Sequence, residues 1–269
     1  MNIKAIRKEI KTKNSYLCVG LDTDINRLPE GFTKDYRGVI AFNKEIINAT
    51  HDYAISYKVN TAFYEQLGSN GWKALEKTRE MLPDNVLSIA DAKRGDIGNT
   101  SKMYAKAFFE TLGFDAVTVA PYMGIDSVQP FLEFDNKFTI VLGLTSNMGS
   151  VDFQTNTLYR PLLYKTVLKT VQSWGTVDNL MFVVGATKAS ALKEIRDIIP
   201  NHFLLIPGVG AQGGSAKEVC VNGVNDHGGL LINSSRGIIY ASDKKDFADV
   251  ARQKAKEIAL ETKPYTQHL

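Results

Sequence analysis

The strongest constraint on the fold of this chain is a regular alternation of short apolar runs with longer amphipathic segments. The apolar runs are rich in Val, Ile, Leu and Phe and are nearly continuous, which is typical of strands buried on both faces. They occupy residues 16–22, 55–60, 86–93, 114–121, 138–146, 180–187, 202–210 and 229–235. Helical patterns lie between them, as at residues 71–82, 100–112 and 245–260.

Eight strand–helix units in about 250 residues predict a closed parallel (β/α)8 barrel, the TIM-barrel fold. A doubly wound open sheet is the alternative, but eight regular units fit it less well. We expect a single barrel domain over residues 1–269, with a short N-terminal helical extension and a long loop at 146–160. A polar, glycine-containing connection of that length is typical of a lid or a binding loop.

Composition narrows the class of protein. A net charge of +3 indicates no nucleic-acid partner. The two cysteines, Cys18 and Cys220, lie far apart and form neither a disulfide framework nor a zinc motif, and the scattered histidines predict no metal site. The polar N-terminus lacks the apolar core of a signal peptide, and no apolar run approaches the roughly 18 residues of a membrane span. We expect a cytoplasmic protein without membrane contact.

Polar residues gather where the predicted strands end. Asp22 ends the first run, Asp91 and Lys93 end the third, and Lys58 lies inside the second. The carboxyl ends of barrel strands carry the active site in this fold, and a buried lysine is rare unless it is paired. Asp91 and Lys93 are two apart and therefore share a face. With Lys58 they predict an alternating Lys–Asp–Lys array; a purely structural salt bridge is disfavoured, because barrel interiors are normally filled by branched apolar residues.

Two late motifs predict a phosphate site. The segment "PGVGAQGG" begins at Pro207, and its glycines let backbone N–H groups approach an anion. Its match to GxGxxG is a weak dinucleotide signature, because no acidic residue follows at the right distance. The segment "NSSRG" adds the Ser235 hydroxyl and the Arg236 guanidinium, which can bind phosphate through two hydrogen bonds. Loops after strands seven and eight form the usual phosphate site of such barrels.

The motif "DAKRGDIGNT" at residues 91–100 resembles the signature of the orotidine 5′-phosphate decarboxylase family, Asp-x-Lys-x-x-Asp on the third strand. The resemblance covers residues 16–240, because "VGLD", "YKVN", "PGVGAQGG" and "SSRG" follow in the expected order. The longer fifth loop is similar to the longer-chain, type 2 branch. The resemblance implies decarboxylation of orotidine 5′-phosphate to uridine 5′-phosphate and CO2 in pyrimidine (UMP) biosynthesis, without any cofactor.

The resemblance also implies which residues act. The charged tetrad expected to carry the chemistry consists of Lys58, Asp91, Lys93 and Asp96. Lys93 would stabilise the negative charge that develops at C6 and then deliver a proton there. In the family the second acid of the motif reaches into the other subunit of a dimer. We therefore expect a homodimer in which Asp96, Ile97 and Thr100 act across the interface.

The substrate-binding residues that the resemblance implies are Asp22 at the ribose, Ser146 at the pyrimidine, Gln212 between base and phosphate, and Pro207, Ser235 and Arg236 at the phosphate. One position departs from the family pattern. The segment "SNMG" carries Met148 where the family has proline, which loosens the backbone of the fifth loop.

Two other functions compete. Relatives with the same Asp-x-Lys-x-x-Asp core are metal-dependent and act on sugar phosphates, as aldolases or decarboxylases, with the acids ligating Mg²⁺. Ser146, Gln212 and the lack of extra carboxylates near the second strand argue against that function. A catalytically silent barrel that binds a nucleotide is the other candidate. It has no need of two lysines and two acids at a buried centre.

Overall fold

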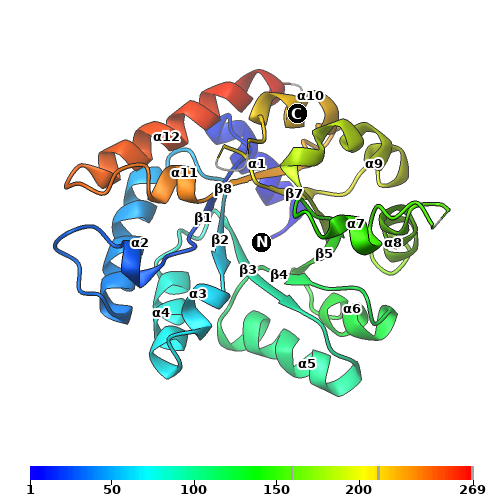
Figure 1. Cartoon of the computed structure of the whole chain (residues 1–269), viewed down its shortest axis with the longest axis horizontal. Coiled ribbons are helices and arrows are strands. Elements are labelled where there is room, and N and C mark those ends of the chain that lie inside the picture. The colour runs from blue at the N-terminus through cyan, green and yellow to red at the C-terminus, as the bar shows by residue number, and fades with distance from the viewer. Residues whose placement is uncertain (159, 211–212, 268–269) are drawn as a thin grey trace.

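Eight parallel strands close into a barrel in which each strand pairs with the next along the chain and β8 returns to β1 (Figure 1). This computed structural model describes residues 1–158, 160–210 and 213–267. The strands are β1 (Leu17–Gly20), β2 (Ser56–Asn60), β3 (Leu87–Arg94), β4 (Ala116–Val119), β5 (Phe138–Leu144), β6 (Leu180–Val184), β7 (Leu204–Pro207) and β8 (Leu230–Ser234). The predicted (β/α)8 barrel is confirmed, and the pairing of β1 with β8 excludes an open sheet.

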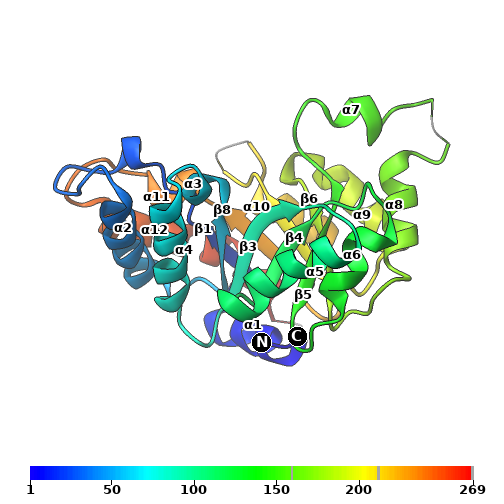
Figure 2. The same cartoon turned by 90° about the horizontal axis from the view of Figure 1, so that it is seen from below.

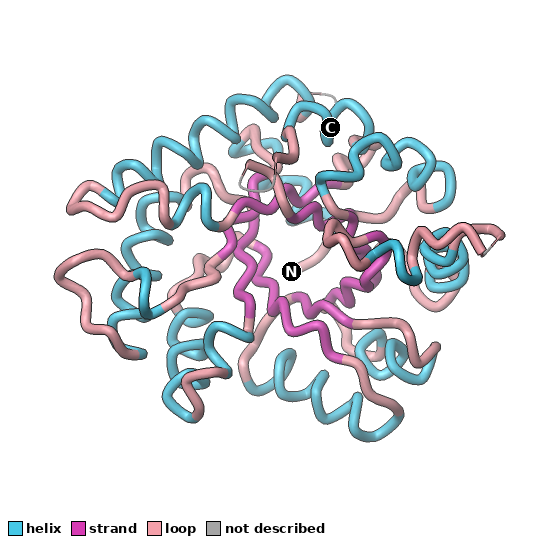
Figure 3. The backbone as a smooth tube through the Cα atoms, viewed as in Figure 1, coloured by secondary structure: helices cyan, strands magenta, loops and turns pink. Residues whose placement is uncertain are grey.

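Helices surround the ring of strands on its outside (Figure 3). The α-helices are α1 (Ile3–Lys13), α2 (Tyr36–Thr50), α3 (Ala62–Glu65), α4 (Ser69–Glu80), α5 (Gly98–Lys106), α6 (Ile125–Leu132), α7 (Ser150–Phe153), α8 (Leu163–Val171), α9 (Leu192–Ile198), α10 (Ala216–Gly223), α11 (Arg236–Ile239) and α12 (Phe247–Thr262). Shorter helical turns are η1 (Ile25–Arg27), η2 (Ala107–Thr111), η3 (Ala186–Ala191) and η4 (Lys263–Tyr265). Among the residues described, no helix has both the length and the apolar character that a membrane span requires.

The strands are buried on both faces, because one face fills the barrel and the other packs under the helices. The strands β1, β4, β6 and β8 are buried along their whole length. This explains why the runs in the sequence are continuous rather than alternating. Each fully buried Val, Leu or Ile stabilises the fold by about 1.5–3 kcal/mol relative to an exposed one.

Most strands are shorter than the apolar runs that predicted them, but β3 (Leu87–Arg94) is as long as its run at 86–93. The run at 16–22, for example, contains β1 only from Leu17 to Gly20. Beyond this strand, the Leu21 N–H still donates a hydrogen bond to the Lys58 carbonyl oxygen at 2.9 Å, and Asp22 then lies in the wall of the cavity. The rim after β5 is not all loop, since the predicted connection at 146–160 contains the helix α7. Figure 2 shows α7 at the opposite end of the barrel from α1.

Candidate active site

A cavity of about 670 Å³ opens at the carboxyl ends of the strands. Among the described residues, every strand except β4 or the segment just after it contributes to its wall. Its charged residues come from the β1, β2, β3 and β8 ends, and its apolar ones include Leu142, Val183 and Leu205 from β5, β6 and β7. One side of the cavity is therefore lined by charged side chains and the other mainly by apolar ones.

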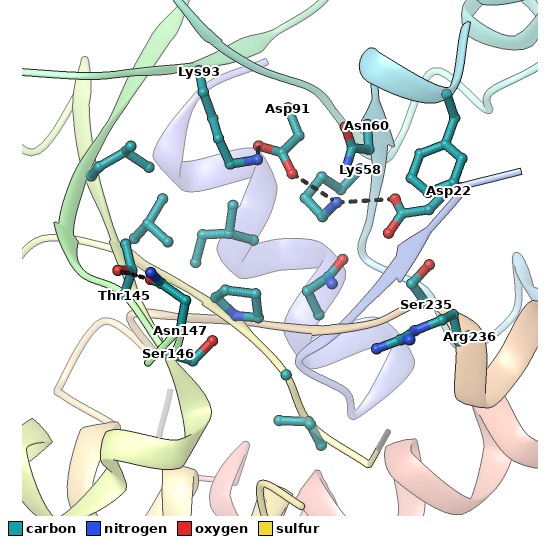
Figure 4. A pocket seen from close by; sticks show the side chains of 18 of the residues that line it. Asp22, Lys58, Asn60, Asp91, Lys93, Thr145, Ser146, Asn147, Ser235 and Arg236 are labelled. Atoms are coloured by element: carbon teal, nitrogen blue, oxygen red, sulfur yellow. Dashed lines mark hydrogen bonds and ion pairs between the residues drawn. The ribbon is translucent and has the colours of Figure 1, made fainter. Parts of the chain in front are cut away.

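Four charged side chains on one wall form a continuous chain of ion pairs (Figure 4). Lys93 Nζ lies 2.6 Å from Asp91 Oδ1, and Lys58 Nζ lies 3.0 Å from Asp91 Oδ2. Lys58 Nζ also lies 3.3 Å from Asp22 Oδ1. The array therefore alternates in sign as Lys–Asp–Lys–Asp across the ends of three neighbouring strands, so each charge has an opposite neighbour.

The parallel register brings these residues together. Lys58 on β2 pairs with Ile89 on β3, which places Asp91 one pleat further along the same face. The Lys58 side chain is only 4% exposed, whereas the Lys93 side chain is 49% exposed. Of the two ammonium groups that bind Asp91, only that of Lys93 is therefore free to approach a ligand in the cavity.

Burial and pairing act in opposite directions on the two inner groups. Burial alone lowers the pKa of Lys58, but the carboxylates of Asp22 and Asp91 outweigh it and raise that pKa above its usual value. Burial alone raises the pKa of Asp91, but Lys58 and Lys93 outweigh it and hold that pKa below its usual value. Lys58 and Asp91 thus both stay charged between about pH 4 and pH 10. Their contribution to folding stability is lost as the pH falls through the folded pKa of Asp91 or rises through that of Lys58.

The two acids of the array bind an ammonium group, because Lys58 Nζ lies between Asp22 and Asp91. A Mg²⁺ site would need several oxygen ligands that face one point. Among the described residues, no cluster of three or more His, Cys, Asp or Glu side chains could hold a metal ion. The donors at this wall therefore suit a lysine-centred site better than a metal-centred one.

The wall opposite the array is apolar. Leu142, Val183 and Leu205 contribute side chains that cannot hydrogen-bond. Such a wall can pack against the face of a planar ring. Sequence reasoning did not single out these three residues. Each lies in an apolar run, where nothing distinguishes a side chain that lines the cavity from one in the core.

The β7 and β8 ends form one corner of the cavity. Pro207, Gly208 and Val209 line the cavity beside Ser235 and Arg236. Gly208 has a φ of +97°, a conformation that side chains other than glycine's rarely adopt. Within the described residues Arg236 makes no ion pair, so its guanidinium is available to an anionic ligand. Gln212, expected to span base and phosphate, lies outside the residues that the structure describes.

The β1 end adds residues that sequence reasoning missed. Arg27 lines the cavity and stacks on the ring of Tyr240, with its guanidinium carbon 4.0 Å from the ring centroid. The Tyr240 hydroxyl accepts a hydrogen bond from the Asp24 backbone N–H at 2.6 Å. These contacts join the loop after β1 to the loop after β8. No local motif marks the pair, because the two residues are more than 200 positions apart in the chain.

The rim beside β5 contains Ser146, as expected, together with Thr145 and Asn147 (Figure 4). Met148, the residue that departs from the family pattern, is 92% exposed. It therefore points into solvent in this structure rather than against the cavity wall.

Three of the expected site residues do not line the cavity of their own chain. Asp96 lies on the loop between β3 and α5, where its Oδ1 accepts a hydrogen bond from the Ile97 N–H at 2.8 Å. The Ile97 side chain is 54% exposed, and Thr100 is exposed at the start of α5. Within one chain the structure thus brings Lys58, Asp91 and Lys93 together but leaves the fourth tetrad member outside.

Comparison with known proteins gives one consistent family. The model of the orotidine 5′-phosphate decarboxylase / HUMPS family matches residues 15–250. A protein of Christiangramia forsetii named orotidine 5′-phosphate decarboxylase is 60% identical over 259 residues, which cover 95% of each chain. One of the same name from Flavobacterium johnsoniae is 54% identical and covers 97% of each chain.

Solved structures agree with these relatives. The structure of the Leishmania donovani OMP decarboxylase superimposes with a TM-score of 0.82 at 37% identity, covering 97% of this chain and 100% of that one. The structure of a putative orotidine-monophosphate decarboxylase from Toxoplasma gondii gives a TM-score of 0.85 at 35% identity, covering 97% and 98%. The similarity therefore extends over the whole barrel rather than over a single motif.

Proposed function

The chain belongs to the orotidine 5′-phosphate decarboxylase / HUMPS family, and from that premise we propose how its barrel carries out the reaction. It converts orotidine 5′-phosphate to uridine 5′-phosphate and CO2, a step of pyrimidine biosynthesis. The observation that carries the mechanism is the ion-paired chain Lys93–Asp91–Lys58–Asp22 at the wall of the cavity. Its terminal ammonium group is the one that faces the cavity.

Lys93 acts on the reacting carbon. Cleavage of the bond between C6 and the carboxylate releases CO2 and leaves the electron pair on C6. The Lys93 ammonium stabilises that charge and then transfers a proton from Nζ to C6, which forms the product. The neutral amine regains a proton from solvent, to which its half-exposed side chain has access. All the atoms and charges of the step are accounted for by the substrate, Lys93 and water.

Asp91 acts on the leaving group. Its carboxylate is held ionised by Lys58 and Lys93. When the substrate is bound with C6 near Lys93, the Asp91 carboxylate lies near the substrate carboxylate, and the two negative charges repel. The repulsion raises the free energy of the bound substrate and fades as neutral CO2 leaves. The free-energy difference between the bound substrate and the transition state is therefore smaller. Lys58 keeps Asp91 in place and is itself paired with Asp22, which we propose also contacts the ribose.

The phosphate binds at the corner formed by the β7 and β8 ends. The backbone of Gly208 and Val209, the Ser235 hydroxyl and the Arg236 guanidinium line this corner, and Pro207 fixes the start of the loop. Gln212 is proposed to span base and phosphate, and Ser146 to contact the pyrimidine. Binding energy from the phosphate orders the rim and assists the distant reacting centre.

Replacing Arg236 with alanine is expected to raise KM for orotidine 5′-phosphate about 10- to 100-fold, because a charge-assisted hydrogen bond to the phosphate is lost. Turnover of orotidine, which has no phosphate, should change less than about threefold. The loss of the orotate ultraviolet band measures both reactions. Arg37, an exposed arginine paired with Asp35 outside the cavity, gives the control variant Arg37→Ala. Equal losses with both substrates would contradict the assignment of Arg236.

We also propose that the active unit is a homodimer. Asp96 lies outside its own cavity, on the loop before α5, and α5 and the neighbouring α6, with the loops before them, carry exposed apolar side chains: Ile97, Met103, Tyr122, Met123 and Ile125. A cluster of this kind on a globular surface is typical of an interaction site, and a two-fold dimer places the same patch on both chains. Such a dimer lets Asp96, Ile97 and Thr100 complete the partner's site.

The metal-dependent sugar-phosphate reaction of other family members fits less well. The acids of this site are occupied by Lys58, and the relatives at 54–60% identity are all named for decarboxylation of the nucleotide. A silent nucleotide-binding barrel fits less well too, because binding alone does not require four coupled charges. Organisation of residues 1–269 as one domain remains our prediction.

A further inference from the structure

The strand β4 supports the charged wall through hydrogen bonds to Asp91 and Lys93. Among the described residues it places no side chain in the cavity wall, yet Thr118 on β4 bonds to both members of the Asp91–Lys93 pair. The Thr118 hydroxyl donates a hydrogen bond to Asp91 Oδ1 at 2.9 Å. The same oxygen accepts one from the backbone N–H of Lys93 at 2.9 Å. Thr118 is fully buried, and its hydrogen bond to Asp91 is buried with it, whereas the bond from Lys93 is partly buried.

The bond to the Lys93 backbone lies at a distortion of β3. Ala90 pairs with Val117 and Arg94 pairs with Val119, so three residues of β3 stand opposite Thr118 alone. This irregularity is a β-bulge, which changes the direction of a side chain relative to the regular alternation along a strand. Lys93 has a φ of +46°, in the left-handed region that is rare for such a residue. Its N–H has left the regular ladder and bonds to the Thr118 side chain instead.

The bond to Asp91 restrains the other half of the pair. Asp91 Oδ1 accepts from both the Thr118 hydroxyl and Lys93 Nζ, while Oδ2 accepts from Lys58 Nζ (Figure 4 shows the two lysines). The carboxylate is therefore held by three donors from three strands. Removing this neutral donor leaves the charges of both lysines unchanged, but the carboxylate of Asp91 loses one of its three hydrogen bonds.

We propose that the Thr118 hydroxyl is a positioning group for decarboxylation, which holds the bulge at Lys93 and the carboxylate of Asp91 in one geometry. This proposal rests on the proposed function, because it takes Lys93 Nζ to act on C6 of the substrate and gives Thr118 the role of orienting it. Without the hydroxyl, the partly buried Lys93 N–H loses its partner and β3 relaxes toward regular pairing. A shift of about 1 Å at a reacting group can cost about 10²-fold in rate. Substrate binding through the phosphate corner is not involved.

A neighbouring strand provides a matched comparison. Thr139 on β5 is also fully buried, but its hydroxyl has no hydrogen-bond partner among the residues described. Burial of a threonine in this barrel therefore does not by itself lead to a hydrogen bond with a charged residue. The two hydrogen bonds of Thr118 are specific to its place beside the array.

The test compares Thr118→Val, which keeps the volume and removes the hydroxyl, with Thr118→Ser, which keeps the hydroxyl and removes a methyl group. We expect kcat to fall about 10- to 100-fold in Thr118→Val with KM within about threefold of wild type. Thr118→Ser should recover kcat to within about threefold of wild type. Thr139→Val is the control and should leave kcat unchanged. A role in packing alone predicts the reverse order, because serine leaves a cavity and valine does not.

Titration with uridine 5′-phosphate counts the folded sites, so kcat is expressed per binding site in every variant. If valine does not fold at this position, Thr118→Ala and Thr118→Ser form a second pair that differs only in the hydroxyl. Full activity of Thr118→Val, or equal losses in the valine and serine variants, would overturn the proposal while leaving the proposed function intact. A wild-type chain that binds the product but shows no turnover would overturn the proposed function first.

Discussion

Replacing Lys93 with alanine is expected to reduce kcat by about 10⁴-fold or more. A positioned proton donor is worth about 10²–10⁴-fold, and a fixed charge at the developing anion about 10²–10³-fold. Both contributions come from one ammonium group in this site, so a single substitution removes them together. The remaining array keeps its shape, because Asp91 still accepts hydrogen bonds from Lys58 and Thr118.

The measurement is turnover of orotidine 5′-phosphate by the purified variant, followed at the orotate ultraviolet band over hours. Product binding should persist, which shows that the cavity is still formed. Lys102 on α5, an exposed lysine paired with Glu133, gives the control variant Lys102→Ala. If Lys93→Ala retained turnover near that of wild type, another group would have to supply the proton and the role given to Lys93 would be wrong.

The second large effect is expected at Asp96. Asp96→Ala should lose most activity on its own, although Asp96 does not line the cavity of its own chain. Mixing the inactive Asp96→Ala and Lys93→Ala proteins should restore activity. In the mixed dimer, the chain with intact Lys93 receives intact Asp96 from its partner, so one of the two sites is complete. Random exchange of equal amounts predicts about a quarter of the wild-type activity, because about half of the dimers are mixed.

The mixing experiment also shows what to expect if Asp96 does not act across the interface. If Asp96 serves its own chain, every site in the mixture lacks one of the two groups and no activity returns. A mixture of Lys93→Ala with Lys58→Ala is the control. Both of those residues lie in one array within one chain, so every site in their mixed dimers carries one defect. Activity regained in that control would show that the chains exchange something other than Asp96.

The barrel could be predicted from the sequence because its strands are buried on both faces. Continuous apolar runs at a regular spacing leave few alternative folds, and the helices expected at 71–82 and 245–260 correspond to α4 (Ser69–Glu80) and α12 (Phe247–Thr262). The charged array was predicted for a related reason. Lysine and aspartate inside an apolar run are conspicuous, since they cannot be buried alone.

Other features of the site could not be predicted in this way. Thr118 lies in "DAVTVAP", where a threonine is an ordinary strand residue, and its role depends on a bulge in the neighbouring strand. Arg27 and Tyr240 meet only because β1 and β8 close the barrel. The helix α7 is a single short turn within a polar segment, too short to produce a periodic pattern. The contacts of Thr118 and of Arg27 with Tyr240 are long-range in sequence, so local patterns carry no information about them.

The most direct test of the central claim, decarboxylation at a lysine–aspartate array, uses the unmodified protein. Purified enzyme is mixed with orotidine 5′-phosphate, with and without EDTA, and the loss of the orotate ultraviolet band is followed. The account predicts loss of the band at the same rate in both samples, because Lys93 supplies both the stabilising charge and the proton, and neither needs a metal ion. No loss of the band, or loss that EDTA abolishes, would contradict it.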